Sequence, residues 1–272
     1  MPEREGPMSD APLWQPSEER RDASAMKRFM EALSADLGVS LRTYRDLHAF
    51  SVERMEDFWS ELWDFCDVRG TKGARVLIDG DDMLAARFFP DARLNYADNL
   101  LAAEGSGPAI IFRAEDRVRD RVSRDGLRAT VGRVRAALEA AGVRTGDRVA
   151  GVVPNMPQTV MAFLGAASMG AVWSSCSPDF GPRGILDRFG QIEPKVLFTC
   201  DGYFYNGRTF LLADKIAEVL KDLPSVEKVV VIDLAGTASD MVAALGERAV
   251  TWDDFLAPHA GAEPRFDPLP FD

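Results

Sequence analysis

Two short stretches of the sequence carry side chains that could do chemistry. The first is GAVWSSCSPDFG, residues 170–181, in which three serines and Cys176 cluster around a Pro-Asp-Phe-Gly turn. The second is DGYFYNGR, residues 201–208, which combines two tyrosines, an Asn-Gly pair and an arginine. A serine or cysteine could act as a nucleophile, whereas an arginine next to a glycine suits phosphate binding.

A nucleophile in the first stretch needs a base within hydrogen-bond reach, and the sequence offers no clear one. The two histidines, His48 and His259, lie in no recognisable catalytic motif. There is no G-x-S-x-G elbow, and Cys176 has the position of a small buried residue in a strand. The three cysteines also match no zinc-binding spacing. We therefore assign no catalytic residue and no metal ligand to this chain.

The second stretch contains the parts of a phosphate or nucleotide contact. Arg208 offers a planar fork of donors that matches phosphate geometry. Gly207 would let the backbone approach a ligand, and Tyr205 could stack on a base. A glycine-containing turn with a solvated arginine is the simpler interpretation, and the residues alone favour it.

Both stretches follow expected strands of an α/β fold. Helical patterns separate four strand-like runs, at residues 147–154, 171–177, 195–201 and 226–233. This alternation predicts a parallel, doubly wound sheet with helices on both faces, its strands buried. Ligands bind beyond the carboxyl ends of such strands, so the two stretches would line one edge of the sheet if their strands are neighbours.

We expect three regions along the chain: a flexible tail over 1–23, a helical region over 24–107 and an α/β subdomain over 108–272. The helical region contains a short strand at 74–79, and Ser51 is the expected cap of its last long helix. The α/β subdomain opens with a hairpin over 108–123. A helix capped by Ser123 follows the hairpin and ends at Gly142.

Composition limits the partners of the chain. Its 272 residues are 46% hydrophobic and carry a net charge of −11, which is typical of a soluble globular protein without the basic face that nucleic acid or anionic membranes require. The uncharged run 149–178 is long enough to span a bilayer, but prolines and polar residues interrupt it, which favours a buried strand–helix–strand unit. An odd number of cysteines without a signal peptide favours the cytoplasm.

The stretch LEAAGVRTGDRVAGVVPNMPQTVMAFLGAASMGAVWSSCSPDFG, residues 138–181, resembles the N-terminal domain of adenylate-forming acyl-CoA synthetases. These enzymes form an acyl-adenylate from an acid and ATP, then pass the acyl group to coenzyme A. The motifs LWDFCDV, ARLNYADNLL, LDRFGQIEPKVLF and YNGR resemble more closely the branch that activates acetoacetate. The resemblance runs from about Leu13 to the end of the sequence, and implies acetoacetate, ATP and coenzyme A as small-molecule substrates with Mg²⁺ as cofactor. It implies no oligomeric state.

The resemblance also implies where coenzyme A would bind. In related acetyl-CoA synthetases, one matching loop borders the coenzyme A tunnel and a second matching segment contacts the nucleotide end, with an arginine against phosphate. The corresponding residues here are Ser177, Pro178 and Asp179 in the loop, and Tyr205, Asn206, Gly207 and Arg208 in the segment. Position 205 often carries arginine in acetyl-CoA synthetases, so its tyrosine leaves one phosphate contact open.

In the family, a segment like FDPLPFD (266–272) leads into a Ser/Thr/Gly-rich loop that holds the ATP phosphates. The sequence ends at Asp272, so we expect the N-terminal portion of a synthetase, which lacks the acid pocket and is inactive alone. Two alternatives stay open. The parent could be a ligase for another short acid such as acetate or propionate, or the chain could be a non-catalytic module that binds coenzyme A, a nucleotide or a partner.

Overall fold

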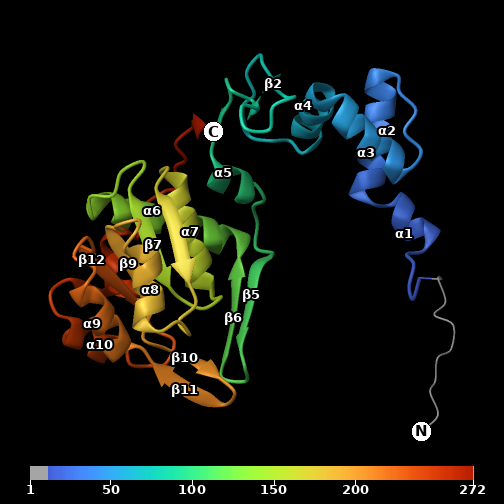
Figure 1. Cartoon of the computed structure of the whole chain (residues 1–272). Coiled ribbons are helices and arrows are strands. Elements are labelled where there is room, and N and C mark those ends of the chain that lie inside the picture. Colours follow the sequence, from blue (N-terminus) through green and yellow to red (C-terminus); the bar gives the residue numbers. More distant parts are fainter. Residues whose placement is uncertain (1–11, 272) are drawn as a thin grey trace, which may run out of the picture. The chain divides into compact units, whose positions relative to one another are not determined.

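The computed structural model describes residues 12–271, which form two compact units (Figure 1). One unit comprises 12–68, 72–92 and Phe271, and the larger one comprises 69–71 and 93–270. Residues 1–11 of the predicted tail lie outside the described residues, while a short helix, α1 (Glu18–Asp22), follows in the rest of it.

The smaller unit is built mainly from helices. Its elements are α1, α2 (Ala25–Leu37), α3 (Tyr44–Glu53), α4 (Met55–Phe65), β2 (Leu77–Ile78) and β3 (Arg87–Phe88). The expected cap at Ser51 is wrong, since Ser51 lies inside α3 and Arg54 precedes α4 without a side-chain cap. Thr43 instead caps α3, because its hydroxyl and the Asp46 carboxylate each accept the other residue's backbone N–H.

The larger unit contains the parallel sheet. Its elements are β1 (Gly70–Thr71), β4 (Arg93–Leu94), α5 (Tyr96–Leu100), β5 (Pro108–Ala114), β6 (Val118–Ser123), α6 (Arg124–Ala140), β7 (Arg148–Val152), α7 (Pro157–Ser168), β8 (Val172–Cys176), α8 (Pro182–Phe189), β9 (Val196–Cys200), β10 (Gly202–Tyr205), β11 (Arg208–Leu211), α9 (Ala213–Lys221), β12 (Lys228–Ile232), α10 (Ala238–Leu245), β13 (Ala249–Thr251), α11 (Trp252–Leu256), the 3-10 turn η1 (Ala257–His259) and β14 (Leu269–Pro270). Helix α5 packs on α7, so this unit takes in residues upstream of the predicted division at 108.

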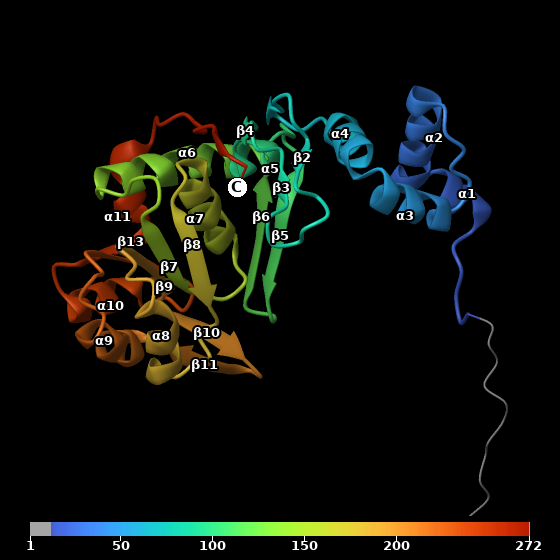
Figure 2. The same cartoon turned by 45° about the horizontal axis from the view of Figure 1, so that its top comes forward.

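The five strands of the main sheet are parallel and lie in the order β13-β12-β9-β7-β8. The order reverses at β7, because β8 joins one side of it and β9 joins the other. Right-handed crossovers then place α7 on one face and α8, α9 and α10 on the opposite face (Figure 2). The predicted doubly wound α/β sheet is confirmed.

Strand β8 differs from the expected buried strand, because it forms an edge of the sheet. Val172 is 52% exposed and Ser175 is also exposed, whereas Cys176 is buried. Parallel strands are fully buried only in the interior of a sheet, and the order of strands is not visible in the sequence.

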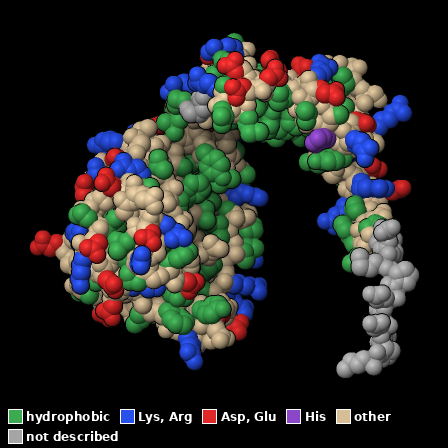
Figure 3. Space-filling view, viewed as in Figure 1, with side chains coloured by type: hydrophobic (Ala, Val, Ile, Leu, Met, Phe, Trp, Pro, Cys, Tyr) green, Lys and Arg blue, Asp and Glu red, His purple; other side chains and the backbone are tan. Residues whose placement is uncertain are grey.

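In Figure 3, hydrophobic side chains also gather on the surface over α5 and α7, where Tyr96 and Leu100 are exposed.

Helices α6 and α7 pack closely at Gly165. A Cβ atom at this position would lie 2.4 Å from Cγ1 of Val134, well inside van der Waals contact. We therefore expect Gly165→Ala to lower the free energy of unfolding by about 1–3 kcal/mol, the usual cost of overpacking. Urea denaturation would measure this, with Gly261→Ala as the control, since a Cβ there meets nothing within 4 Å. Equal midpoints for the two variants would contradict this account of the packing.

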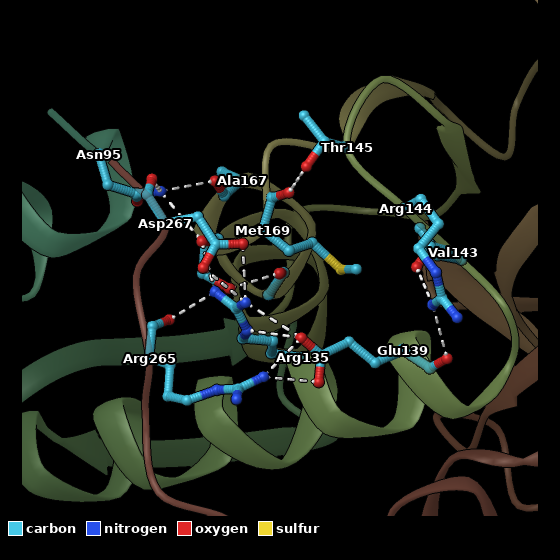
Figure 4. A network of polar contacts seen from close by, with 12 residues as sticks. Asn95, Arg135, Glu139, Val143, Arg144, Thr145, Ala167, Met169, Arg265 and Asp267 are labelled. Atoms are coloured by element: carbon cyan, nitrogen blue, oxygen red, sulfur yellow. Dashed lines mark hydrogen bonds and ion pairs between the residues drawn. The ribbon is translucent and has the colours of Figure 1, made fainter. Parts of the chain in front are cut away.

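A C-terminal segment, residues 262–270, runs back over α6 and α7 (Figure 4). It passes α6 at Gly132, where a Cβ would lie 2.7 Å from the Pro264 nitrogen. Its last two residues, β14, pair with β4, which in turn pairs with β1. The segment is thus part of the larger unit rather than a free end.

Arg135 of α6 holds this segment in place. Its guanidinium is buried and donates to the Ser168 carbonyl at 2.7 Å, to the Arg265 carbonyl at 3.0 Å and to both Asp267 carboxylate oxygens at 2.9 and 2.8 Å. The Asn95 amide adds hydrogen bonds to the carbonyls of Ser168 and Asp267. These donors satisfy carbonyl groups at the end of α7 that the helix itself leaves unpaired.

No helix among residues 12–271 combines the length and the hydrophobicity needed to cross a membrane.

Candidate functional site

One cavity of about 280 Å³ lies at the carboxyl ends of the central strands. Its walls come from the ends of β7, β8 and β12, from β10, and from the end and turn of the β5–β6 hairpin; the lining residues include Pro154, Asn155, Ser177, Pro178, Asp179, Tyr203, Tyr205 and Leu234. The strand order reverses between β7 and its neighbours, and open α/β sheets bind ligands beyond such a switch point.

The cavity brings together part of the predicted coenzyme A site. Ser177, Pro178, Asp179 and Tyr205 line it, although they lie up to 28 residues apart in the chain. Asn206, Gly207 and Arg208 are not in its wall; they form the turn and the first residue of the strand that follows Tyr205. The two stretches chosen from the sequence therefore do meet at one edge of the sheet.

The loop after β8 is held in a defined turn. The Ser177 hydroxyl donates to the Asp179 carboxylate at 3.0 Å and accepts the Asp179 N–H at 3.3 Å. From α9, the Lys215 ammonium donates to the Pro178 carbonyl at 2.6 Å. These contacts hold the loop in place as a wall of the cavity, and none of them involves Tyr205.

Residues 202–211 form a β-hairpin, and the glycine-containing turn favoured by the sequence lies at its tip. Tyr205 pairs with Arg208 across a two-residue turn, in which Asn206 has φ +49° and Gly207 has φ +72°. Positive φ at both central residues is the mark of a type I′ turn, for which Asn-Gly is the preferred pair. The conformation of Gly207 is thus explained by the turn, and its contact with coenzyme A stays a prediction.

The side chains of this hairpin differ in how far they are packed or exposed to solvent. Tyr203 stacks on Phe210 with ring centroids 5.2 Å apart, and its burial together with the Asp179 carboxylate raises the pKa of its phenol to about 12. Tyr205 and Arg208 are exposed. Within residues 12–271, the guanidinium of Arg208 has no hydrogen bond or ion pair, so it is available to an anion.

Two residues of the β5–β6 turn hold the tip of the β10–β11 hairpin, and the sequence did not reveal them. Glu115 accepts the N–H of Gly207 at 3.1 Å. Arg117 donates to the Gly207 carbonyl at 2.8 Å and to the Thr209 hydroxyl at 3.2 Å. Its guanidinium also lies 5.0 Å from the ring centroid of Phe204, a distance typical of cation–π contacts. The two hairpins are therefore joined at their tips.

Asp201, directly after β9, holds the loop that contributes Leu234 to the cavity wall. Its buried carboxylate accepts the N–H groups of Leu234 at 2.8 Å, Ala235 at 2.9 Å and Thr237 at 2.6 Å. Burial alone would raise the pKa of Asp201, but these donors outweigh burial and lower it. The neighbouring Asp233 shows the opposite shift, because burial and the charge of Asp201 raise its pKa.

Cys176 has the environment of a core residue. Burial raises the pKa of its thiol to about 11, so the thiolate needed for nucleophilic attack is almost absent at neutral pH. The predicted role as a small buried residue is confirmed. In the part of the chain that the structure describes, no group of three or more His, Cys, Asp or Glu side chains is placed to hold a metal ion.

Two family models match this chain. The AMP-binding enzyme model matches residues 102–267, and the acetyl-coenzyme A synthetase N-terminus model matches residues 44–100. The first covers the parallel sheet and all residues around the cavity.

Named relatives agree with these models. The acetoacetyl-coenzyme A synthetase of Rhizobium meliloti (strain 1021) is 45% identical over 97% of this chain and 40% of its own length. The acetoacetyl-CoA synthetase of Macaca fascicularis is 36% identical over 99% of this chain and 41% of its own. The solved structure of acetoacetyl-CoA synthetase from Streptomyces lividans superposes with a TM-score of 0.88 at 40% identity, covering 96% of this chain and 40% of that one. The chain thus spans about two fifths of the length of the relatives it matches. With the AMP-binding model covering more than half of its residues, the chain belongs to the AMP-binding enzyme family.

Proposed function

We propose that the chain is part of an ATP-dependent acetoacetate–CoA ligase and provides a binding face for the nucleotide end of coenzyme A. The parent reaction joins acetoacetate to ATP as an acyl-adenylate with release of pyrophosphate, and coenzyme A then displaces AMP. The supporting observation is the single cavity that combines the loop after β8 with Tyr205, beside an arginine that has no partner in the described chain. The relatives named above support acetoacetate as the acid.

The chemistry of these residues fits the nucleotide end of coenzyme A. Tyr205 presents an exposed ring on which an adenine can stack. Arg208, its cross-strand partner, offers a planar set of donors for phosphate oxygens. Ser177 to Asp179 form a wall whose polar groups already hydrogen-bond to one another. This wall therefore shapes the site, and the polar contacts to the ligand come from other residues. Asn206 and Gly207 hold the turn between the two contact residues.

No residue of this chain is assigned to ATP, Mg²⁺ or acetoacetate. The role of the described residues is to bind and orient, since electrostatic stabilisation and positioning are the main contributions to adenylate chemistry. We further propose a cytoplasmic location, because all three cysteines are free thiols. The expected partners are small molecules, with neither nucleic acid nor membrane among them.

Removal of the Arg208 charge tests this proposal. In the ligase that contains this chain, Arg208→Ala should raise KM for coenzyme A about tenfold or more, the effect of losing one charged hydrogen bond. Acetoacetate-dependent exchange of labelled pyrophosphate into ATP should stay unchanged, because that half-reaction needs no coenzyme A. Steady-state kinetics and the exchange assay measure the two effects separately.

Arg45→Ala is the matched control, since this substitution removes the same charge from an exposed position on α3, in the smaller unit. An equal loss of pyrophosphate exchange and of coenzyme A turnover in Arg208→Ala would contradict the proposed role. A ligase specific for acetate or propionate would keep this same site, so activity with each acid separates that alternative.

A further inference from the structure

Arg113 lies in the wall of the same cavity and is absent from the predicted site. It is the sixth residue of β5, it is exposed, and it lines the cavity together with Tyr205 and Asp179. Among residues 12–271 its guanidinium has no hydrogen bond or ion pair. The two acidic groups of the cavity wall are already engaged, because Glu115 accepts from Gly207 and Asp179 accepts from Ser177.

The neighbours of Arg113 in the β5–β6 ribbon add to its positive charge. Arg113 lies directly opposite Arg119 in the antiparallel register, and Arg121, two residues further along β6, shares the same face. Like charges directly opposite each other destabilise a hairpin. In the described chain none of the three guanidiniums has a protein partner, and Figure 3 shows basic side chains along the edge that this ribbon forms.

This arrangement is unusual for an acidic chain. The net charge is −11, so carboxylates are abundant in the sequence, yet among residues 12–271 none forms an ion pair with these arginines. A bound phosphate would relieve the repulsion between Arg113 and Arg119 and would receive charge-assisted hydrogen bonds from both. The contacts of Arg117 and Glu115 with Gly207 join this ribbon to the hairpin that carries Arg208. Arg113 and Arg119 on one hairpin and Arg208 on the other are therefore parts of one connected structure.

We propose that Arg113, assisted by Arg119, binds a phosphate group of the coenzyme A nucleotide from the β5–β6 ribbon. This inference rests on the proposed function and assigns a second cationic contact to the same site, on an element about 90 residues away from Arg208.

Calorimetric titration of the chain with coenzyme A tests the assignment. Arg113→Gln should weaken binding about tenfold, as expected for one charge-assisted hydrogen bond, and Arg119→Gln should weaken it less. Arg121→Gln is the matched control, because it removes the same charge from the same face but does not line the cavity. The thermal midpoint of Arg113→Gln should equal or exceed that of the unmodified chain, since a repulsion is removed.

Dephospho-coenzyme A, which lacks the 3′-phosphate, separates the two phosphate positions. A loss seen with coenzyme A alone assigns Arg113 to the 3′-phosphate, and an equal loss with both ligands assigns it to the diphosphate. Unchanged binding by Arg113→Gln, with Arg208→Ala weakened, would overturn this inference and leave the proposed function standing. Failure of the unmodified chain to bind either ligand would overturn both.

Discussion

Asp201→Ala is expected to lower the free energy of unfolding by about 3 kcal/mol, since it leaves three partly buried N–H groups without their carboxylate acceptor. Those donors belong to Leu234, Ala235 and Thr237, in the loop that leads into α10. Because Leu234 is also a wall of the cavity, coenzyme A binding should weaken together with stability. Urea denaturation and calorimetry would measure the two effects.

Asp201→Asn separates the charge from the size of the side chain. One amide oxygen can still accept from Leu234 and Ala235, but the amide nitrogen then faces the N–H of Thr237, so most of the loss should remain. Asp233→Asn is the control; it removes a like charge and keeps an acceptor for Gly236, so stability should hold or rise. An Asp201→Asn variant as stable as the unmodified chain would contradict the role given to this carboxylate.

The lowered pKa of Asp201 determines how its contribution to stability depends on pH. Its folded pKa lies below the ordinary value of 3.8, so its stabilising effect is complete above that value and is lost as pH falls further. The raised pKa of Asp233 means that this neighbour takes up a proton first on acidification. In Asp201→Asn the pKa of Asp233 should therefore fall back toward 3.8, which NMR titration of the carboxyl carbons can follow.

The succession of strands and helices could be read from the sequence, because local patterns determine it. Pro157 opens α7, and Ser123 accepts the N–H of Gly126 at the start of α6, as the capping preferences predict. The order of the strands could not be read, because it depends on which strand pairs with β7 after each crossover. For this reason β8 was expected to be buried, although its place at the edge leaves Val172 exposed.

The site was predictable only where it follows directly from a strand end. The strand ends indicated the two stretches that contain Ser177 to Asp179 and Tyr205, because carboxyl ends of neighbouring parallel strands share one edge, and these residues do line one cavity. From the residues alone a glycine-containing turn was favoured at Asn206-Gly207, and this pair is indeed the strongest short hairpin signal. Arg113, Glu115 and Arg117 were missed, since their partners lie about 90 residues away and no local pattern encodes such contacts.

Arg135→Met is expected to destabilise the larger unit by about 2–3 kcal/mol, because it removes a buried charge that four acceptor groups share. These acceptors are the carbonyls of Ser168 and Arg265 and the carboxylates of Glu139 and Asp267. This loss is smaller than that for a fully buried pair, because the Asp267 carboxylate is half exposed and water can replace part of the contact. Methionine has a similar length, so the loss reports the hydrogen bonds more than the packing.

The structural consequence should be confined to residues 262–270. Their backbone is held by Arg135 and Asn95, and by the Asp267 N–H that donates to Ser168 at 2.9 Å. Hydrogen exchange of this segment should rise far more than that of β9 or β12, which are buried in the centre of the sheet. Uniformly raised exchange across the sheet would show instead that Arg135 supports the whole unit.

A double-mutant cycle identifies the partner that matters. Asp267→Asn alone removes one charge but keeps the backbone contacts of the segment, and in the Arg135→Met background it should have little further effect. Arg135→Lys is the conservative comparison: an ammonium keeps the charge but lacks the planar fork that reaches two carbonyls and two carboxylates together. If Lys restores the stability of the unmodified chain, charge alone holds the segment; if it restores less than half, the fork geometry does.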